Sequence, residues 1–512
     1  MTLQKFDPKT LLFFVILGIA EVYTVGAFGS VEPFFGHPSV VFRENARLLF
    51  LAVGIAGLFL LPAGKQGQVI PQFARLLSVP LLILVVWGLI SVVNARSDQR
   101  MYEFIVRLVP DRPWLWGPGS ESMTTSKGLV QELVIVILFM ATIIRSTYSY
   151  AWRGILGSFV LCGVAVTLCG FLHKALGMEH IYGMETVLGR KQELPDIYFA
   201  PFVYNANAAS FLNICTALAL GLAFYQMRAR PGSPVTMLWL VAGATCVIGV
   251  LLAASKAGVL IAVAQLGLFG LWQLPFLLKL WKDRKGRRIV INTEKKALYI
   301  AGAVIFGIFA IASVSTVIGR FDELIEHSKR DQGSATTSGR SAMREKVIDF
   351  VSADKLGWRG SGPGSFGHYM PYMIGPEDER LFSQLWTFAH CDPLQTIMEW
   401  GYLGALCWFF IGIGAVVRAT WLGATAKAGT ASAHALKGIA IALLGVGIHS
   451  TYDFPFSIFS IHIMVMALVA IAWNLQGDGQ PKARKSRRKK KKAEQKAKET
   501  PVPIPTDGET TA

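Results

Sequence analysis

Residues 340–404 read RSAMREKVIDFVSADKLGWRGSGPGSFGHYMPYMIGPEDERLFSQLWTFAHCDPLQTIMEWGYLG. This polar stretch lies between long apolar runs and is the largest water-compatible insertion in the chain. It contains a Gly-Ser-Gly-Pro-Gly turn at 360–364 and reaches His390 just before a new helix. Asp392 suits the N-cap of that helix, and Gln395 completes the spacing of a capping box. The pattern therefore predicts that His390 lies just outside a helix N-terminus, where backbone donors favour an anion.

The regions around this stretch are apolar and indicate a membrane protein. Hydrophobic residues make up 53% of the 512 residues and charged residues only 16%. Continuous apolar runs of roughly 20 residues are typical of transmembrane helices, because a helix satisfies its own backbone in lipid. We expect an all-α polytopic fold with about 12 transmembrane helices. The expected spans are 11–29, 48–63, 77–94, 128–145, 154–172, 204–226, 235–253, 257–279, 298–318, 398–417, 436–450 and 457–474.

The charges predict how this chain is oriented. Residues 481–500 contain eleven Lys or Arg and two Glu, a composition typical of the cytoplasmic side. An even number of spans then places both termini in the cytoplasm and the long loops outside. We expect a membrane domain at 1–480, with a large periplasmic loop of short helices at 319–397 and a disordered basic tail at 481–512. The tail lacks interleaved aromatic residues, so we expect contact with anionic lipid and not with nucleic acid.

Three basic residues fall on the predicted outer side, namely Lys256, Arg340 and His390. Each has an ordinary explanation: Lys256 can snorkel at a helix end, Arg340 can be a solvated loop residue, and His390 can be structural. If the three converge, they form an anion site that needs no metal, with Arg suited to binding a phosphate through two hydrogen bonds. No acidic pair suggests a convincing metal site, and we expect no cofactor.

Further polar residues are candidates for the same site. Glu399 begins a membrane span, where a carboxylate is costly unless paired. It is expected either to orient His390 or a neighbouring Arg, or to form a structural pair with an interfacial residue. Asn205 and Asn207 open the span at 204–226; Asn207 lies on a polar helix stripe that either joins helices or lines a cavity. The glycines at 360–364 lack the Lys-Ser/Thr of a nucleotide loop and predict a tight turn.

Several short motifs follow one another in a fixed order along the chain. They are Asn-Ala-Asn-Ala-Ala at 205–209, Ala-Ser-Lys-Ala-Gly at 254–258, Arg320, Gly339-Arg340, the turn from Trp358 to Phe366, and His-Cys-Asp-Pro-Leu-Gln-Thr-Ile-Met-Glu-Trp-Gly at 390–401. Taken in order, these landmarks resemble the O-antigen ligase and polymerase superfamily of bacterial envelope enzymes. The similarity covers about residues 200–410, and its most specific part is the motif from His390 to Gly401. Lys256 stands where relatives usually have Arg, and Cys391 stands where they have Asn or a similar polar residue.

This resemblance implies a metal-independent, inverting glycosyltransferase of the bacterial inner membrane with a periplasmic active site. The donor would be an oligosaccharide or polysaccharide linked to undecaprenyl diphosphate, and the acceptor lipid A–core or another glycan. Arg340 and Lys256 would hold the diphosphate, together with Arg320. His390 would act as general base or as a phosphate contact, oriented by Glu399. Asn205 and Asn207 would line the cavity.

Two other functions stay open at this point. A polymerase of the same superfamily would extend the glycan instead of moving it to a different acceptor. A transporter or flippase for lipid-linked glycan would also be polytopic and basic in its cavity. A transporter predicts charges buried along several spans, whereas charges within the expected spans are rare here.

Overall fold

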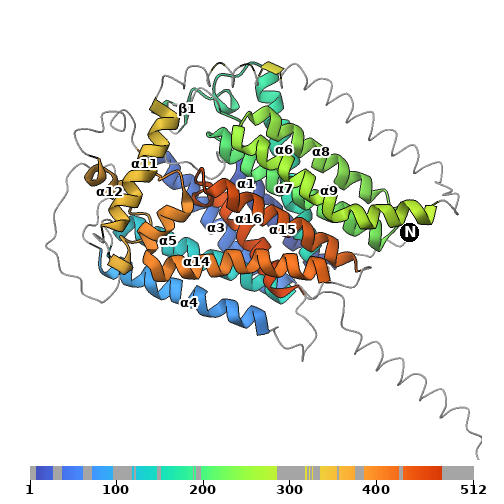
Figure 1. Cartoon of the computed structure of the whole chain (residues 1–512), viewed down its shortest axis with the longest axis horizontal. Helices are drawn as coiled ribbons and strands as arrows, with labels where there is room; N and C mark the ends of the chain where they lie inside the picture. The colour runs from blue at the N-terminus through green and yellow to red at the C-terminus, as the bar shows by residue number, and fades with distance from the viewer. Residues whose placement is uncertain are drawn as a thin grey trace, which may run out of the picture.

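A computed structural model describes the part of the chain that carries most of these landmarks (Figure 1). Residues 7–26, 37–61, 72–95, 118–119, 123–146, 151–187, 190–191, 198–284, 318–319, 322, 326, 335–353, 357–374, 386–425 and 430–475 are described. Three of the sequence predictions lie outside these residues. They are Arg320, the span at 298–318 except Ile318, and the basic tail at 481–512.

The described chain is almost entirely helical, which confirms the all-α prediction. Its longer helices are α1 (Pro8–Gly26), α3 (His37–Leu60), α4 (Gln72–Val93), α5 (Met123–Ser146), α6 (Ala151–Ala175), α7 (Asn205–Ala229), α8 (Val235–Ala253), α9 (Lys256–Arg284), α11 (Ala335–Ser352), α14 (Asp392–Thr425), α15 (Ala431–Ser450) and α16 (Phe459–Asn474). Short elements are η2 (Ile181–Gly183), η3 (Gly357–Arg359), α12 (Phe366–Met373) and η4 (Pro455–Ser457). A two-residue hairpin joins β1 (Thr186–Val187) to β2 (Arg190–Lys191).

Nine helices within the described residues are long and apolar enough to cross a membrane. Three of the twelve expected spans are not among them. The span at 48–63 falls largely within α3, the span at 457–474 coincides with the shorter apolar helix α16, and the span at 298–318 is almost wholly outside the described residues. The structure therefore shows a multi-pass helical membrane protein without confirming the count of twelve.

Helix α7 is the centre of the bundle and packs against α6, α8, α9 and α15. In the most apolar stretch of α7, 89% of the residues are buried. Gly221 of α7 faces Gly438 of α15, and a Cβ atom on Gly438 would lie 2.8 Å from the Cα of Gly221. Small residues at such a crossing allow two backbones to touch, which is how membrane helices associate without a hydrophobic driving force between them. This crossing fixes the first half of α15 against the second half of α7.

Helix α14 is broken near its start, and this break positions the glycine turn. Gly401 has φ 65° and ψ −177°, a conformation open almost only to glycine. The interruption frees backbone carbonyls of the preceding turn. Those of Met398 and Glu399 accept hydrogen bonds from Ser361 N–H and Gly362 N–H, each at 2.8 Å. The predicted tight turn is confirmed, with Gly360, Gly362 and Gly364 all at positive φ.

One end of the bundle carries the polar stretch quoted above. In Figure 1, α11 and α12 lie together at this end, beside the start of α14. A small apolar cluster joins them, with Met343 and Val347 of α11 packed among Phe366 and Met370 of α12 and Met398 of α14. We call this end the site end. The short helices expected at 319–397 are thus present where the structure describes this region.

Candidate functional site

His390 lies at the site end in a backbone conformation that its neighbours hold in place. Its φ is +48°, in the left-handed region that non-glycine residues seldom adopt. Its ring meets Phe454 edge-on at 4.8 Å and Trp386 at 5.4 Å between centroids. The side chain is 15% exposed. The ring is therefore fixed in position but still reachable from one side.

The carboxylate of Asp453, in the turn that follows α15, holds this histidine in place. Nδ1 of His390 lies 3.1 Å from Oδ1 of Asp453, whose side chain is 4% exposed. Two further bonds tie the segments together: Asp392 N–H donates to Asp453 O at 3.3 Å, and Phe456 N–H donates to Asp392 Oδ2 at 2.9 Å. Asp392 thus caps the η4 segment with its side chain. Gln395 reaches back as a capping box predicts, but its Oε1 accepts from Ala389 N–H at 3.1 Å.

The protonation states of this pair follow from burial and from the neighbouring charges. Burial lowers the pKa of His390; Asp453 opposes this, while Arg340 and Arg344 lower that pKa further, so it lies below its ordinary value. Burial raises the pKa of Asp453, but the hydrogen bond from His390 and the charges of His390 and Arg340 outweigh it. Near pH 7 the imidazole is therefore neutral and the carboxylate ionised. Nδ1–H then donates to Asp453, which leaves Nε2 as a proton acceptor.

Arg340 is connected to His390 through Tyr204, the residue just before α7. The Arg340 guanidinium donates a hydrogen bond to the Tyr204 hydroxyl and lies over the Tyr204 ring, 5.7 Å from its centroid. The same ring stacks on Phe454 at 5.6 Å and meets His390 edge-on at 6.4 Å. Arg340 and His390, which sequence reasoning paired, are thus brought together. Their common neighbours come from the start of α7 and from the turn between α15 and α16.

Arg344 is a further cation at this site that the sequence reasoning missed. It follows Arg340 by four residues on α11, so both lie on one helix face. Its guanidinium lies over the Tyr452 ring at 5.7 Å, and its charge acts on His390. The i, i+4 spacing of two arginines on a short amphipathic helix is the signal that points to it. Asp453 was missed as well, although a carboxylate at the end of an apolar run is costly unless paired.

Lys256 reaches the same end of the bundle at the start of α9. Asn205 Nδ2 donates to Ala253 O at 3.0 Å, which ties the α8–α9 turn to the residue after Tyr204. Lys256 itself is exposed. Asn207 is fully buried within α7. The two asparagines therefore differ: Asn205 holds the turn that carries Lys256, and Asn207 lies inside the bundle.

Glu399 supports the glycine turn. Its Oε2 accepts from Gly364 N–H at 2.8 Å, and its Oε1 accepts from Phe366 N–H at 3.2 Å and from Gln395 Nε2 at 2.9 Å. These bonds join α14 to the turn and to the start of α12. Among the described hydrogen bonds, the carboxylate that contacts His390 is that of Asp453, and none joins Glu399 to the histidine.

The fold and this end of the bundle define a multi-pass α-helical membrane protein with a polar, cation-rich site at one end. A comparison with protein families narrows the class: residues 240–409 match the family model described as O-antigen ligase. This segment of the chain is therefore similar to the O-antigen ligase family, which confirms the resemblance seen in the sequence motifs. The match includes Lys256, Arg340, His390 and Glu399, but not Asp453. No curated protein matches the chain.

The family match supports a membrane glycosyltransferase of the ligase or polymerase type that acts on lipid-linked glycan. The geometry is compatible with that chemistry in two respects. Two arginines and a lysine lie at one end of the bundle, and their positive charges suit an anionic group. A histidine held by a carboxylate has one ring nitrogen left to accept a proton.

Proposed function

We propose that the protein transfers a glycan from an undecaprenyl-diphosphate carrier to a sugar hydroxyl of an acceptor, in the manner of an O-antigen ligase. The reaction needs a site for a diphosphate, stabilisation of charge on that diphosphate as it leaves, and a base for the acceptor hydroxyl. The observation that carries the proposal is the contact between two hydrogen-bonded pairs: His390 with Asp453, and Arg340 with Tyr204, whose rings His390 and Tyr204 meet edge-on.

The diphosphate would be held by cations of the site end. Arg340 and Arg344 come from one face of α11, and Lys256 comes from the start of α9. Arg320 is a further candidate outside the described residues. A guanidinium presents two parallel donors to a phosphate and keeps its charge, so it stabilises the charge that develops when the bond to the sugar breaks. No metal is required for this step in the proposal.

His390 would act as the general base. Its Nε2 would accept the proton of the acceptor hydroxyl as that oxygen attacks the anomeric carbon, while the diphosphate leaves with the bonding electrons. Attack opposite the leaving group inverts the anomeric centre. Asp453 would keep the imidazole in the required tautomer and stabilise the imidazolium that forms. Glu399 would contribute by holding the glycine turn, and Asn205 by fixing the turn before Lys256.

The proposed orientation places the site end in the periplasm and the protein in the bacterial inner membrane. Helix α1 starts and α16 ends at the opposite end of the bundle; Phe14 packs against the start of α6, and Asn474 Nδ2 donates to Ile144 O near the end of α5. That end carries Arg145, Arg153 and Lys437, as expected for a cytoplasmic face. Labelling of single cysteines placed at residues 147 and 178 by a membrane-impermeant reagent tests it: only position 178 should react in intact cells.

A reconstituted assay tests the reaction itself. The full chain in vesicles receives defined lipid-linked repeats with or without a lipid A–core acceptor. Product that appears only with the acceptor, by a single transfer, supports a ligase. A ladder of longer glycans without the acceptor indicates a polymerase, and movement of intact lipid-linked glycan across the membrane without transfer indicates a flippase. Activity that persists in chelator supports the metal-independent step, and loss restored by a divalent cation contradicts it.

A further inference from the structure

A large groove beside α14 is not explained by the transfer site. Its volume is about 1210 Å³, above the roughly 300–1,000 Å³ of ordinary small-molecule sites. It is bounded by α3, α5, α14, α15 and α16. None of the three cations first assigned to the donor, Lys256, Arg340 and His390, lines it. The groove therefore provides a second place for a ligand, separate from those groups.

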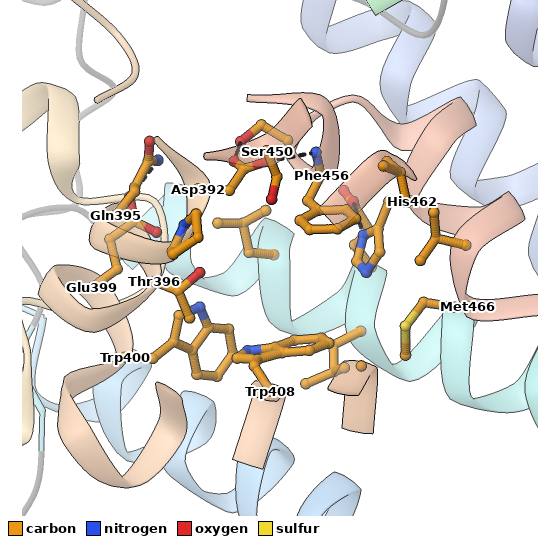
Figure 2. A pocket seen from close by; sticks show the side chains of 18 of the residues that line it. Asp392, Gln395, Thr396, Glu399, Trp400, Trp408, Ser450, Phe456, His462 and Met466 are labelled. Carbon is orange, nitrogen blue, oxygen red and sulfur yellow. Dashed lines mark hydrogen bonds and ion pairs between the residues drawn. The ribbon is translucent and has the colours of Figure 1, made fainter. Parts of the chain in front are cut away.

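Most of the groove is apolar and opens toward the outside of the bundle. Ile413, Leu444 and Ile448 line it and are also exposed, at 61%, 40% and 44%. In a membrane-spanning bundle, exposed apolar side chains of this kind face lipid. Figure 2 shows Trp400 and Trp408 along one wall, with Met466 on the side away from Glu399. A hydrocarbon chain can thus enter from the bilayer without crossing a polar barrier.

The groove also has fixed charges at one margin. Arg43 and Arg47, one turn apart on α3, both bind Glu132 of α5 through Nε and Nη2, at 2.8–3.2 Å. Glu132 is only 3% exposed, whereas Arg43 and Arg47 are 21% and 13% exposed. The shared carboxylate fixes both guanidinium groups, and no hydrogen bond among the described residues uses their Nη1 atoms. His462 Nδ1 lies 3.4 Å from the same carboxylate.

The charge of this margin selects among headgroups. Arg43, Arg47 and Lys127 contribute three positive charges, and Glu132 and Glu44 contribute two negative ones. One positive charge remains, which matches the net charge of −1 of an anionic phospholipid headgroup, whereas a zwitterionic headgroup is neutral overall. A diphosphate carries more charge than this margin neutralises. The remaining acidic residues of the groove, Asp392 and Glu399, lie toward the glycine turn and would repel it.

We propose that this groove binds a bilayer phospholipid, with its phosphodiester at Arg43 and Arg47 and one acyl chain along α14 and α15. The assignment does not depend on the transfer reaction proposed above. It places an anionic phospholipid beside the helix that carries Glu399 and that begins just after His390. The bound chain would fill the space between α14, α15 and α16 and keep the broken start of α14 supported.

Two glycines allow the groove to be filled without disturbing the fold. Gly412 and Gly447 line it, and a Cβ atom on either residue meets no atom within 4 Å. Leucine at these positions projects into open space and favours the helix over glycine. Gly267 of α9 is a matched control: it is equally free of contacts and does not line the groove. Arg47→Gln tests the headgroup, since Arg43 still neutralises Glu132 in that variant.

The test is lipid retention by the purified full chain, measured by native mass spectrometry. The protein is offered phosphatidylglycerol, phosphatidylcholine or a polyprenyl diphosphate. We expect one phosphatidylglycerol per chain, retained at least tenfold more than phosphatidylcholine. Gly412→Leu, Gly447→Leu and Arg47→Gln should each reduce that retention at least tenfold, and Gly267→Leu should leave it unchanged.

Two results would overturn the proposal. One is retention of phosphatidylglycerol that is unaffected by Gly412→Leu and Arg47→Gln, which would mean nonspecific association with the apolar surface. The other is displacement of phosphatidylglycerol by the polyprenyl diphosphate, together with loss of diphosphate binding in Gly412→Leu. The groove would then belong to the donor chain, and the phosphodiester assignment would be wrong.

Discussion

His390 and Asp453 are 63 residues apart in sequence, yet Nδ1 of the histidine lies 3.1 Å from Oδ1 of the aspartate. The contact exists because α14 and α15 pack as an antiparallel pair, so the start of one helix meets the end of the other. It joins a motif inside the matched O-antigen ligase segment to a residue beyond it. The proposed base therefore depends on a helix pair and not on one motif.

Replacing His390 by Ala should lower glycan transfer by roughly 10²–10⁴-fold, the usual contribution of a general base. Transfer is measured as labelled glycan moved to the acceptor, with the amount of protein in the membrane held equal. His180→Ala is the control, because His180 uses its backbone carbonyl to accept from His173 Nε2. Transfer by His390→Ala at the wild-type rate would remove the histidine from the chemistry.

The pH profile of Asp453→Asn tests the pairing of this residue with His390. The ionised carboxylate raises the histidine pKa, while burial and the charges of Arg340 and Arg344 lower it. Without the carboxylate the pKa falls further. A base must be neutral, so transfer increases as pH rises through this pKa, and its acid limb should move to lower pH in the variant. The maximal rate should fall because the tautomer is no longer held. An unchanged acid limb would contradict the pairing.

Tyr204→Phe isolates the contact between the Tyr204 hydroxyl and Arg340. The ring stack on Phe454 is kept, but the hydroxyl that accepts from the guanidinium is lost. A hydrogen bond to a charged group contributes roughly 1.5–3 kcal/mol, so transfer should fall by about 10- to 100-fold. The matched control is Tyr225→Phe at the other end of α7, where Arg153 donates to Tyr225 at 2.6 Å. Equal losses in both variants would indicate a structural role only.

Substitutions at Lys256 test the role of its charge without disturbing buried packing, because the residue is exposed at the start of α9. Lys256→Ala should leave the melting temperature unchanged and reduce transfer at limiting donor, whereas Lys256→Arg should retain transfer. The physical reason is that the proposed role needs a positive charge near the diphosphate and no buried contact. The measurement is transfer rate against donor concentration, and a wild-type rate for Lys256→Ala at low donor would exclude the role.

Gly401→Ala should destabilise the protein by at least about 3 kcal/mol. The residue has φ +65°, and a Cβ atom there would lie 2.3 Å from the carbonyl oxygen of Trp358. Strain at such a conformation costs roughly 1–3 kcal/mol before any clash. Thermal unfolding in detergent measures the effect, with Gly267→Ala as the unstrained control. A melting temperature equal to that of the control would show that the break in α14 is dispensable.

The sequence by itself determined the class of fold and most of the landmarks. Runs of roughly 20 apolar residues require helices in lipid, whatever their partners are. The tight turn at 360–364 was local as well, because glycine adopts positive φ without a steric cost. The break at Gly401 was not predicted, since glycine permits positive φ but does not require it. Arg340 and His390 were identified from residue type and order alone.

Tertiary packing alone decided which groups meet. Asp453 and Arg344 were missed because their roles arise from the contact of α15 with α14 and from the placement of α11. Glu399 was expected to orient His390 or a neighbouring Arg, or to form a structural pair. Two of its described hydrogen bonds instead hold Gly364 and Phe366, more than 30 residues away. The hydrophobicity of one segment is enough to predict that it forms a membrane helix. Hydrogen bonds between distant side chains depend instead on how the helices cross. Those crossings are set by small residues such as Gly221 and Gly438, and the local sequence around a glycine does not indicate which helix it packs against.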